Sequence, residues 1–514
     1  MHIFEFRPLV ISALSSRLSG EFVASESVRS NTLSHLAKAL NFESQLDAEL
    51  TGLTHDSRQV KPGDLYIAIP GFQKHGIDFL NQAIAAGAVA VASDEYGCKI
   101  AQSKNIPWVL LENPRPDMAA IAAEFFDQPE QKLRIIGVTG TNGKTTVTQM
   151  LRTLLASSNE KVGVIGTLGA FIGDKEVPTS RTTPESTDLY RLLWQMVSEG
   201  VTTVCMEVSS HALVLDRVAG LTFDVAIFTN LTQDHLDFHG SMADYFAAKE
   251  LLFTGNRTKT AVVFSDDEWG KKLLLSSDAQ QIITVGATGD WKISNVRTDL
   301  AGHTNFDLTG PGCELRVSVP MFGQFNATNA ALCLAVTATL GLDPQAIVQS
   351  LESLPQVPGR MQVVSQFNEA TAIVDYAHTP DAVEKVLTQL RQANPAKLIA
   401  VLGCGGNRDA GKRPIMGQVA AQLSDVLVVT DDNPRFESPE DIRAQIIEGT
   451  VGQPAQVIEI GDRRSAIREA LTLATKGSIV AVLGKGHELG QEVNGVVADF
   501  DDCAVIRSEV SCLN

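Results

Sequence analysis

The sequence predicts an α/β protein of three domains, with a central, mostly parallel sheet of the phosphate-loop type and a Rossmann-like α/β domain after it. Near-continuous apolar runs, which suit strands buried on both faces, alternate with helical patterns along the chain. Each run ends at a polar or glycine-rich turn, and the turn at 140–146 joins a strand to a helix as phosphate-binding loops do. A length of 514 residues fits about three domains of roughly 150 residues each.

The first predicted domain covers residues 1–112. Short strand-like runs at 65–69 and 88–92 alternate there with alanine-rich helical patterns. The two prolines of Asn113-Pro-Arg-Pro116 indicate a linker, and a short helix is expected from Met118 to Phe126.

Two further domains are predicted, at 113–356 and 357–514, separated by the proline-rich stretch 354–360. Both repeat the alternation of apolar runs and helical patterns, which indicates parallel sheets covered on both faces. The expected strands are 135–139, 201–206 and 224–228 in the second domain, and 371–375, 398–402, 426–430 and 479–483 in the third.

The turn Gly140-Thr-Asn-Gly143-Lys144-Thr145-Thr146 carries the chemistry of a phosphate site. Backbone N–H groups of such a turn wrap phosphates, Lys144 adds a positive charge, and the Thr145 hydroxyl can hold Mg²⁺. The full G-x-x-x-x-G-K-[ST] spacing would need glycine at position 138, which is valine. The loop is therefore a shortened variant.

Polar residues follow the neighbouring strands of the second domain. Glu207 comes directly after the run 201–206, and His235 follows the run 224–228. Ligands of open α/β sheets bind at the carboxyl ends of strands, so both residues are placed to hold a magnesium ion beside the loop. For each residue taken singly, an N-cap or turn role stays open.

Two later patterns have ordinary structural explanations. Lys249 lies in a helical pattern and suits a surface lysine, while Asn326 and Asn329 suit a helix start with a capping asparagine.

In the third domain, Arg408, Asn433, Arg435 and Glu488 follow three of the predicted strands. Arginine suits bidentate binding of a carboxylate, and glutamate can accept hydrogen bonds from an ammonium group. The set predicts a site for a zwitterionic amino acid, with surface ion pairs as the structural alternative.

Bulk properties exclude several classes of function. The net charge of −18 and the lack of a long basic patch argue against nucleic-acid binding. Seven scattered cysteines without a C-x-x-C pair indicate a reducing, cytoplasmic protein. The polar start of the chain does not suit a signal peptide, and without a run of about 18 apolar residues we expect no membrane span. A monomer is expected.

Ten motifs in sequence order resemble the Mur ligases over residues 50–505, in particular the branch that adds meso-diaminopimelate. They are GTNGKTT at 140, Arg181-Thr-Thr-Pro, Glu207-Val-Ser-Ser-His, Asn230-Leu-Thr-Gln-Asp-His-Leu-Asp, Ala248-Lys249, Phe325-Asn-x-x-Asn, Pro358-Gly-Arg360, Asp375-Tyr-Ala-His-Thr-Pro380, Asp-Asn-Pro-Arg435 and Gly-Lys-Gly-His-Glu488.

The resemblance implies that ATP, UDP-N-acetylmuramoyl-L-alanyl-D-glutamate and meso-diaminopimelate give the tripeptide, ADP and phosphate, a step of peptidoglycan precursor synthesis. The substrate carboxylate would attack the γ-phosphate to form an acyl phosphate, which the amine would then attack. No protein nucleophile is needed, so catalysis would rest on positioning and charge neutralisation.

The resemblance also implies roles for individual residues. Those for ATP are Gly140, Thr141, Asn142, Gly143, Lys144, Thr145, Thr146, Asn329, Arg360 and Asp375. Those for Mg²⁺ are Thr145, Glu207, His235 and Lys249, the last as a carbamate formed with CO₂. Lys144, Lys249, His235 and Glu207 would be the catalytic residues.

The other two substrates have their own implied residues. Those for the UDP-linked substrate are His55, Ser57, Phe72, Gln73, Lys74, Arg181, Thr182, Thr183, Ser209 and Arg217. Those for diaminopimelate are Arg408, Asp432, Asn433, Pro434, Arg435, Gly484 and Glu488.

Two alternatives stay open at this point. One is a related ligase, either lysine-adding or of the folylpolyglutamate type. Arg435 argues against lysine, which lacks one carboxylate and would leave a buried arginine unpaired. The other is a P-loop motor or regulatory ATPase, against which the shortened loop and the amino-acid site argue.

Overall fold

The computed structural model describes residues 31–179 and 181–513. The chain divides into two compact units, one ending at Glu112 and one beginning at Asn113. Each unit has sheets of its own, and the strands predicted from apolar runs all form within one or two residues of their expected bounds. The predicted α/β class is confirmed.

The first unit is built on a small parallel sheet. Its elements are β1 (Asn31–Thr32), α1 (Leu33–Leu40), β2 (Ser44–Gln45), β3 (Glu49–Leu50), β4 (Gly52–Thr54), β5 (Asp64–Ala68), the 3₁₀ helix η1 (Gly76–Phe79), α2 (Leu80–Ala85), β6 (Ala90–Ser93), α3 (Glu95–Ser103) and β7 (Trp108–Leu110). The strand order is β2-β7-β6-β5-β4, with β2 antiparallel to β7 and the rest parallel. Tyr66, Val91 and Trp108 form its core with Leu80 and Cys98 from the helices.

The second unit contains two large sheets, of which the first begins with the phosphate-loop strand. The elements up to its end are α4 (Pro114–Phe125), η2 (Pro129–Lys132), β8 (Arg134–Thr139), α5 (Lys144–Ala156), β9 (Val162–Gly166), β10 (Gly169–Ile172), β11 (Lys175–Val177), α6 (Ser186–Ser198), β12 (Thr203–Glu207), α7 (Ser210–Val214), β13 (Phe223–Phe228), α8 (Leu236–His239), α9 (Met242–Glu250), β14 (Thr258–Phe264), α10 (Glu268–Ser276), β15 (Gln281–Gly286), β16 (Trp291–Thr298), β17 (Thr304–Gly310), β18 (Cys313–Val319), α11 (Gln324–Thr339), α12 (Pro344–Ile347) and η3 (Val348–Ser353).

This sheet has eleven strands in the order β11-β10-β9-β12-β8-β13-β14-β15-β16-β17-β18. The strands from β9 to β16 are parallel, and antiparallel strands extend both edges. Since β8 lies between β12 and β13, the turns that follow these three strands meet at one edge of the sheet. The register pairs Val138 with Glu207 and Thr139 with Phe228, which fixes the polar residues beside the phosphate loop.

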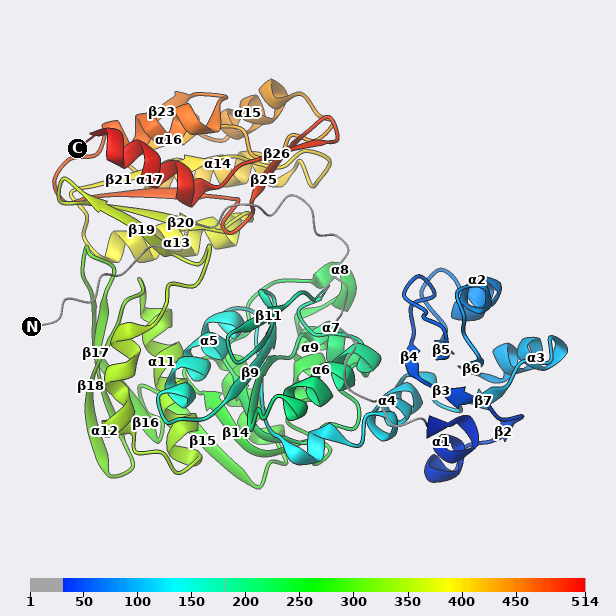
Figure 1. Ribbon diagram of the computed structural model, residues 1–514. Coiled ribbons are helices and arrows are strands. Elements are labelled where there is room, and N and C mark those ends of the chain that lie inside the picture. Colours follow the sequence, from blue (N-terminus) through cyan, green and yellow to red (C-terminus); the bar gives the residue numbers. More distant parts are fainter. Residues whose placement is uncertain (1–30, 180, 514) are drawn as a thin grey trace, which may run out of the picture. The chain divides into compact units, whose positions relative to one another are not determined.

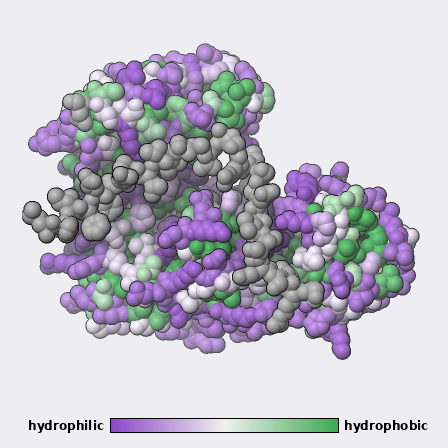
Figure 2. Space-filling view, in the orientation of Figure 1, coloured by the Kyte–Doolittle hydropathy of each residue, from purple (hydrophilic) through white to green (hydrophobic). Residues whose placement is uncertain are grey.

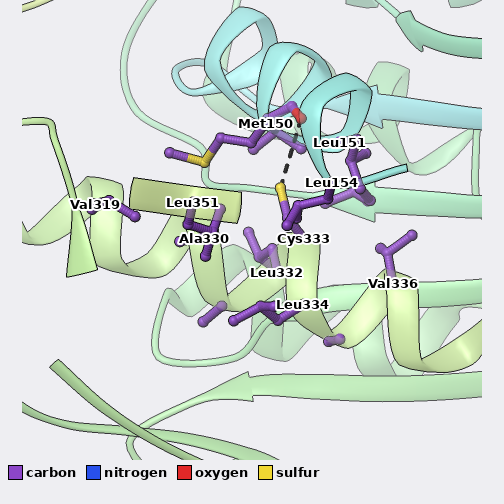
Figure 3. Packing of buried hydrophobic residues seen from close by; sticks show 14 of the residues in the cluster. Met150, Leu151, Leu154, Val319, Ala330, Leu332, Cys333, Leu334, Val336 and Leu351 are labelled. Atoms are coloured by element: carbon purple, nitrogen blue, oxygen red, sulfur yellow. Dashed lines mark hydrogen bonds between the residues drawn. The ribbon is translucent and has the colours of Figure 1, made fainter. Parts of the chain in front are cut away.

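Helices α5 and α11 pack against each other in the core of this sheet (Figure 3). Met150, Leu151 and Leu154 repeat at helical spacing on α5 and are fully buried. They meet α11, where Leu332 is buried and the Cys333 thiol donates to the Val147 carbonyl at 3.6 Å. The apolar face of α5 therefore anchors this helix in the core, and the phosphate loop leads directly into its first turn.

The second sheet of this unit follows residue 361. Its elements are β19 (Gln362–Phe367), β20 (Ala370–Asp375), α13 (Pro380–Gln392), β21 (Lys397–Leu402), α14 (Lys412–Leu423), β22 (Val426–Val429), α15 (Pro439–Glu448), β23 (Gln456–Glu459), α16 (Arg463–Thr472), β24 (Ser478–Leu483), the hairpin β25 (Gly490–Val493) and β26 (Val496–Asp499), and α17 (Asp502–Leu513). The order is β19-β20-β24-β21-β22-β23, parallel except for β19. Figure 1 shows α17 in red beside α16.

One local prediction is wrong. The segment Asn113-Pro-Arg-Pro116, expected as a linker, supplies the first turn of α4. The fixed φ of proline suits the first helical positions, where its missing N–H costs no hydrogen bond. The helix therefore begins at Pro114 and not at Met118.

Most of the face seen in Figure 2 is hydrophilic, and an apolar patch lies where Figure 1 shows the β25–β26 hairpin. The hairpin exposes Val493, Val496 and Val497. Within 31–179 and 181–513, every helix is too short or too polar to cross a bilayer.

Candidate active site

The phosphate loop lies between β8 and α5, with Gly140 and Gly143 both at positive φ, 144° and 89°. The Lys144 ammonium folds back over the turn and donates to the carbonyls of Gly140 and Thr141, each at 2.9 Å. Burial lowers its pKa. Thr145 and Thr146 are buried in the first turn of α5. The loop therefore presents a cation and a helix N-terminus, as an anion site requires.

The loop is tied to the turn that follows β13. The Asn142 N–H donates to Asn230 Oδ1 at 3.0 Å, and its side-chain amide donates to Thr232 Oγ1 at 3.4 Å. Thr232 Oγ1 also accepts from Lys385 of α13 at 3.2 Å. A side chain of the second sheet's helices thus contacts the same threonine as the phosphate loop.

Replacing Gly143 by alanine is expected to lower kcat/KM for ATP at least about tenfold, because a Cβ there would displace a packed neighbour of the phosphate loop. That Cβ would lie 2.7 Å from Oδ1 of the buried Asn329. Gly200→Ala is the matched control, since Gly200 also has positive φ, 76°, but nothing within 4 Å of the added carbon. Initial rates of phosphate release against ATP concentration measure the effect; equal losses in both variants would mean that backbone strain alone matters.

Glu207 ends β12 with its carboxylate fully buried beside the loop. Its Oε1 accepts from the Thr145 hydroxyl and from the Thr167 N–H, both at 2.9 Å, and Oε2 accepts from the Thr167 hydroxyl at 3.1 Å. A carboxylate and a hydroxyl this close, at the start of a phosphate-binding helix, are hard oxygen ligands suited to Mg²⁺. Sequence reasoning missed Thr167, although it directly follows Gly166 at the end of β9.

Lys249 of α9 is buried, with 1% of its surface exposed, so the surface interpretation is wrong. Its ammonium donates to the Gly140 carbonyl at 2.9 Å and lies 4.5 Å from the centre of the Tyr245 ring. Burial lowers its pKa well below the usual value, and the nearby Lys144 lowers it further. Two ammonium groups that donate to one carbonyl oxygen repel each other. Because the pKa of Lys249 is held well below its usual value, Lys249 favours the neutral amine.

His235 lies in the loop after β13, at a positive φ of 51°, with half of its side chain exposed. Its ring packs edge-on against His211, with ring centroids 5.0 Å apart. Over residues 31–179 and 181–513, no three His, Cys, Asp or Glu side chains form a metal-binding group. Magnesium typically takes one or two carboxylates and completes its shell with water and phosphate, which the Thr145–Glu207 pair allows.

The other predicted ATP residues lie on two sides of the loop. Asn329 is buried against Gly143 and donates to Asn326 Oδ1 at 3.1 Å. The capping role suggested for the asparagines is wrong, because α11 begins after Gly323 without a side-chain cap. Asp375 accepts from the N–H groups of Met361 and Ala377, and burial raises its pKa to about 6.

Arg360 is exposed, and its guanidinium lies 5.4 Å from the centre of the Tyr376 ring. Gly359 precedes Arg360 at a φ of 66°, and a Cβ at Gly359 would lie 2.4 Å from the backbone nitrogen of His487. The arginine thus sits where its chain segment packs closely on the loop after β24.

Part of the predicted UDP-substrate set forms one cluster beside Glu207. The Thr183 hydroxyl donates to the Glu207 carbonyl at 2.9 Å and accepts from the Ser209 N–H at 3.1 Å. Arg217 donates to the Thr183 carbonyl at 3.3 Å. The Thr182 hydroxyl lies 3.1 Å from that of Thr167.

Three arginines surround one buried carboxylate next to this cluster. Glu185 lies 2.8 Å from Arg217, 3.0 Å from Arg115 and 4.0 Å from Arg181. Three guanidinium groups around one carboxylate leave a local net positive charge in an otherwise acidic protein. Sequence reasoning missed Arg115 and Glu185, because neither stands at the end of an apolar run.

The remaining predicted UDP-substrate residues lie in the first unit. Ser57 is buried and its hydroxyl donates to Gln82 Oε1 at 3.4 Å. Phe72 is 82% exposed, in the same loop as Gln73 and Lys74. His55 lies just after β4. Their roles stay predictions.

The residues predicted to bind the amino acid, called the amino-acid pocket below, lie in the loops that follow β21, β22 and β24. Asn433 donates from its amide nitrogen to Glu488 Oε2 at 2.8 Å. The Arg435 guanidinium donates to the Gly406 carbonyl at 2.8 Å and lies 3.3 Å from Glu492 Oε2. Arg408 is exposed in the loop after β21.

The backbone of these loops is closely packed. The Gly406 N–H donates to the Asn433 carbonyl at 2.9 Å, and the Pro434 carbonyl accepts from Glu437 at 3.0 Å. Gly484 has a φ of 111°, and a Cβ there would lie 2.7 Å from the carboxylate of the buried Asp432. Asn433 and Glu488 are thus in contact, and Arg435 lies two residues after Asn433 in the same loop. The roles of these residues and of Arg408 stay predictions.

Sequence reasoning missed two buried cations behind this pocket. Lys485 is fully buried next to Asn433 and Glu488. Arg463 is fully buried against Asp502, and it also donates to the carbonyls of Leu483 and Asp431. Lys485 lies in the Gly-Lys-Gly-His-Glu motif, which could have identified it as a site residue. No motif in the sequence points to Arg463.

The fold, with a phosphate loop after β8, is that of ATP-using ligases, and comparison with known proteins gives the family. Residues 138–337 match the Mur ligase middle domain, 359–486 the Mur ligase glutamate ligase domain, and 49–125 the Mur ligase family catalytic domain. The chain belongs to the Mur ligase family.

Individual relatives agree. The chain is 44% identical over 474 residues to the UDP-N-acetylmuramoyl-L-alanyl-D-glutamate–2,6-diaminopimelate ligase of Streptomyces coelicolor, covering 90% of this chain and 93% of that protein. A solved structure of an enzyme of the same name matches with a TM-score of 0.70 and 36% identity, covering 90% of this chain and 95% of that one. Folylpolyglutamate synthase from Mycobacterium tuberculosis shares the fold, with a TM-score of 0.57 at 19% identity, covering 72% of this chain and 92% of that one.

Proposed function

We propose that this chain is an ATP-dependent amide ligase that adds meso-diaminopimelate to UDP-N-acetylmuramoyl-L-alanyl-D-glutamate in peptidoglycan synthesis. The observation that carries the proposal is the pocket of Asn433, Arg435 and Glu488, which offers an amide, a guanidinium and a carboxylate at one sheet edge. The activity named for the relatives at 44% and 36% identity supports it. Because the reaction consumes ATP and a UDP-linked precursor, we place it in the cytoplasm.

The phosphate loop would bind ATP, the nucleotide that the family uses. Its N–H groups and Lys144 would hold the phosphates, with Asn329, Arg360 and Asp375 framing the nucleotide. Thr145 and Glu207 would hold Mg²⁺, with His235 and a carbamylated Lys249 as further ligands. When bound, the ion would neutralise charge on the phosphates.

The chemistry then needs two transfers. An oxygen of the D-glutamate carboxylate attacks the γ-phosphorus, and the bond to the ADP oxygen breaks, which gives an acyl phosphate. The neutral amine of diaminopimelate attacks the acyl carbon, loses a proton and expels phosphate. Thr183, Ser209 and Arg217 beside Glu207 would hold the acceptor carboxylate near the loop, with Arg181 and Thr182.

In the first unit, His55, Ser57, Phe72, Gln73 and Lys74 would bind the uridine end of the substrate. In the amino-acid pocket, Glu488 would accept from an ammonium group, and Arg435 would bind the carboxylate that lysine lacks. Arg408, Asp432, Pro434 and Gly484 would complete that pocket.

The neutral amine of Lys249 can react with CO₂ to form a carbamate and release one proton. A carbamate keeps one N–H, so the hydrogen bond to the Gly140 carbonyl can persist while the new anion faces the loop. This removes the repulsion between Lys249 and Lys144 and supplies an oxygen ligand.

Lys249→Ala is expected to abolish phosphate release, and short carboxylates such as acetate should restore part of it by occupying the vacated space. Lys259→Ala is the control, since Lys259 is an exposed lysine paired with Asp224. Rates with and without added carboxylate test this. Full activity of Lys249→Ala without an additive would contradict the carbamate.

A coupled assay of phosphate release tests the function. The enzyme is given ATP, Mg²⁺, the UDP-linked dipeptide and one amino acid at a time. Release should require the UDP-linked dipeptide and should be much faster with meso-diaminopimelate than with lysine or glutamate. Equal use of lysine would favour a lysine-adding ligase, glutamate use a folylpolyglutamate-type ligase, and turnover without the dipeptide a regulatory ATPase.

A further inference from the structure

Lys485 is the least expected residue near the amino-acid pocket. Its side chain is 0% exposed, one residue past Gly484 at the end of β24. A buried ammonium is strongly destabilising unless acceptors and negative charges surround it. These acceptors are residues of the amino-acid pocket, so the ammonium of Lys485 and the positions of those residues depend on each other.

The ammonium of Lys485 has three neighbours. It donates to Asn433 Oδ1 at 3.0 Å and to Glu488 Oε2 at 3.4 Å, and Asp432 Oδ1 lies 4.0 Å away. All three neighbours belong to the set assigned above to the amino acid.

These contacts decide which way the Asn433 amide faces. An asparagine side chain can present either its oxygen or its nitrogen, and only its hydrogen-bond partners separate the two orientations. Oδ1 accepts from Lys485 and from the Glu492 N–H, both at 3.0 Å. The nitrogen is therefore turned toward Glu488, at 2.8 Å.

We propose that Lys485 is a positioning residue for the incoming amino acid: it holds Asn433 with the amide nitrogen toward the pocket and fixes Glu488 beside it. The proposal rests on the proposed function. Held this way, Asn433 can donate a hydrogen bond to a ligand carboxylate, and Glu488 can accept one from a ligand ammonium. Without the lysine, Oδ1 loses one of its two donors and keeps the Glu492 N–H, so the amide is held less firmly and can leave the position in which its nitrogen faces the ligand.

Lys485→Met is expected to raise the KM for meso-diaminopimelate about 10- to 100-fold, while the KM values for ATP and for the UDP-linked dipeptide stay within about twofold. Lys485→Gln keeps a donor without the charge and should fall between Met and wild type, and Lys485→Arg should recover part of the loss. Lys397→Met is the matched control, a half-buried lysine at the start of β21 that donates to the Leu473 carbonyl.

A double-mutant cycle separates positioning from general damage to the fold. If Lys485 acts through Asn433, then adding Lys485→Met to Asn433→Ala should raise the KM for diaminopimelate little beyond Asn433→Ala alone. Additive effects would overturn the proposal, and so would an equal rise in all three KM values. The Gln and Arg variants keep the cycle available if Lys485→Met does not fold.

A crystal structure of the Lys485→Met or Lys485→Gln variant gives a readout independent of activity. The Asn433 side chain should leave its contact with Glu488, and an unmoved Asn433 would overturn the proposal. A wild-type enzyme that releases phosphate without regard to diaminopimelate would instead contradict the proposed function, with the Asn433 conformation still deciding the role of Lys485.

Discussion

Arg435→Ala should lower kcat/KM for meso-diaminopimelate about 30-fold to several thousand-fold, a loss of about 2–5 kcal/mol of transition-state stabilisation. The KM for ATP should stay within about twofold, because the phosphate loop lies on the other large sheet of the unit. The loss is large because removal of the guanidinium leaves the second carboxylate of the ligand desolvated and without a partner.

Backbone hydrogen bonds fix the position of Arg435. Its N–H donates to the Glu492 carbonyl at 3.0 Å, its carbonyl accepts from Asn494 at 2.6 Å, and its φ is 53°. The residue is thus fixed against β25, and only the side chain can move. On binding, the guanidinium would exchange its contact with Glu492 for the ligand carboxylate.

Three variants make the test of Arg435 specific. Arg435→Lys keeps the charge but not the planar fork and should recover little activity. Arg468→Ala, which removes a half-exposed arginine paired with Glu509, should have no effect on either substrate. The ratio of kcat/KM for diaminopimelate to that for lysine should fall toward one in Arg435→Ala. If ATP and diaminopimelate use decline equally, Arg435 holds the fold and does not select the ligand.

Asp502→Ala should lower the free energy of unfolding by about 3–5 kcal/mol, because it leaves the guanidinium of Arg463 buried without its counter-ion. The pair is fully buried, with bonds of 2.8 Å and 2.7 Å from Arg463 to the two carboxylate oxygens. Arg463 also donates to the carbonyls of Leu483 and Asp431, which lie at the bases of the two loops of the amino-acid pocket. The pocket should therefore lose order together with the fold.

Urea unfolding followed by circular dichroism measures the change. Lys476→Ala is the control: it removes an ion pair with Glu369 in which the side chains are 77% and 67% exposed, and it should cost less than about 1 kcal/mol. Similar losses in the two variants would show that Asp502 is worth no more than a surface partner.

The sequence predicts the strands and the phosphate loop well, because both are local. A run such as 135–139 is apolar throughout, since it is buried on both faces, and a glycine-rich turn follows it. The sequence does not predict the edge strands β16, β17 and β18, of which the last two are antiparallel to their neighbours. Their buried and exposed residues alternate, and this pattern does not say to which sheet edge they add.

The residues of the candidate site likewise divide into those that the local sequence predicts and those that depend on the tertiary fold. Glu207 and Asn433 could be predicted, because Glu207 ends one buried strand and Asn433 lies in the turn after another. The burial of Lys249 could not, since it depends on the Gly140 carbonyl, 109 residues away in sequence. Arg115 likewise reaches Glu185 only through the tertiary fold, and its flanking prolines suggested a linker instead.

Thr232 connects the phosphate loop to a helix of the other large sheet. It accepts from Asn142 on the phosphate loop and from Lys385 on a helix of the sheet that carries the amino-acid pocket. If ATP changes this shared contact, it changes the affinity for the amino acid by some factor, and the amino acid must change the affinity for ATP by the same factor. The binding equilibria therefore do not determine which ligand binds first. A fixed order of addition depends on the binding rates and on the ligand concentrations.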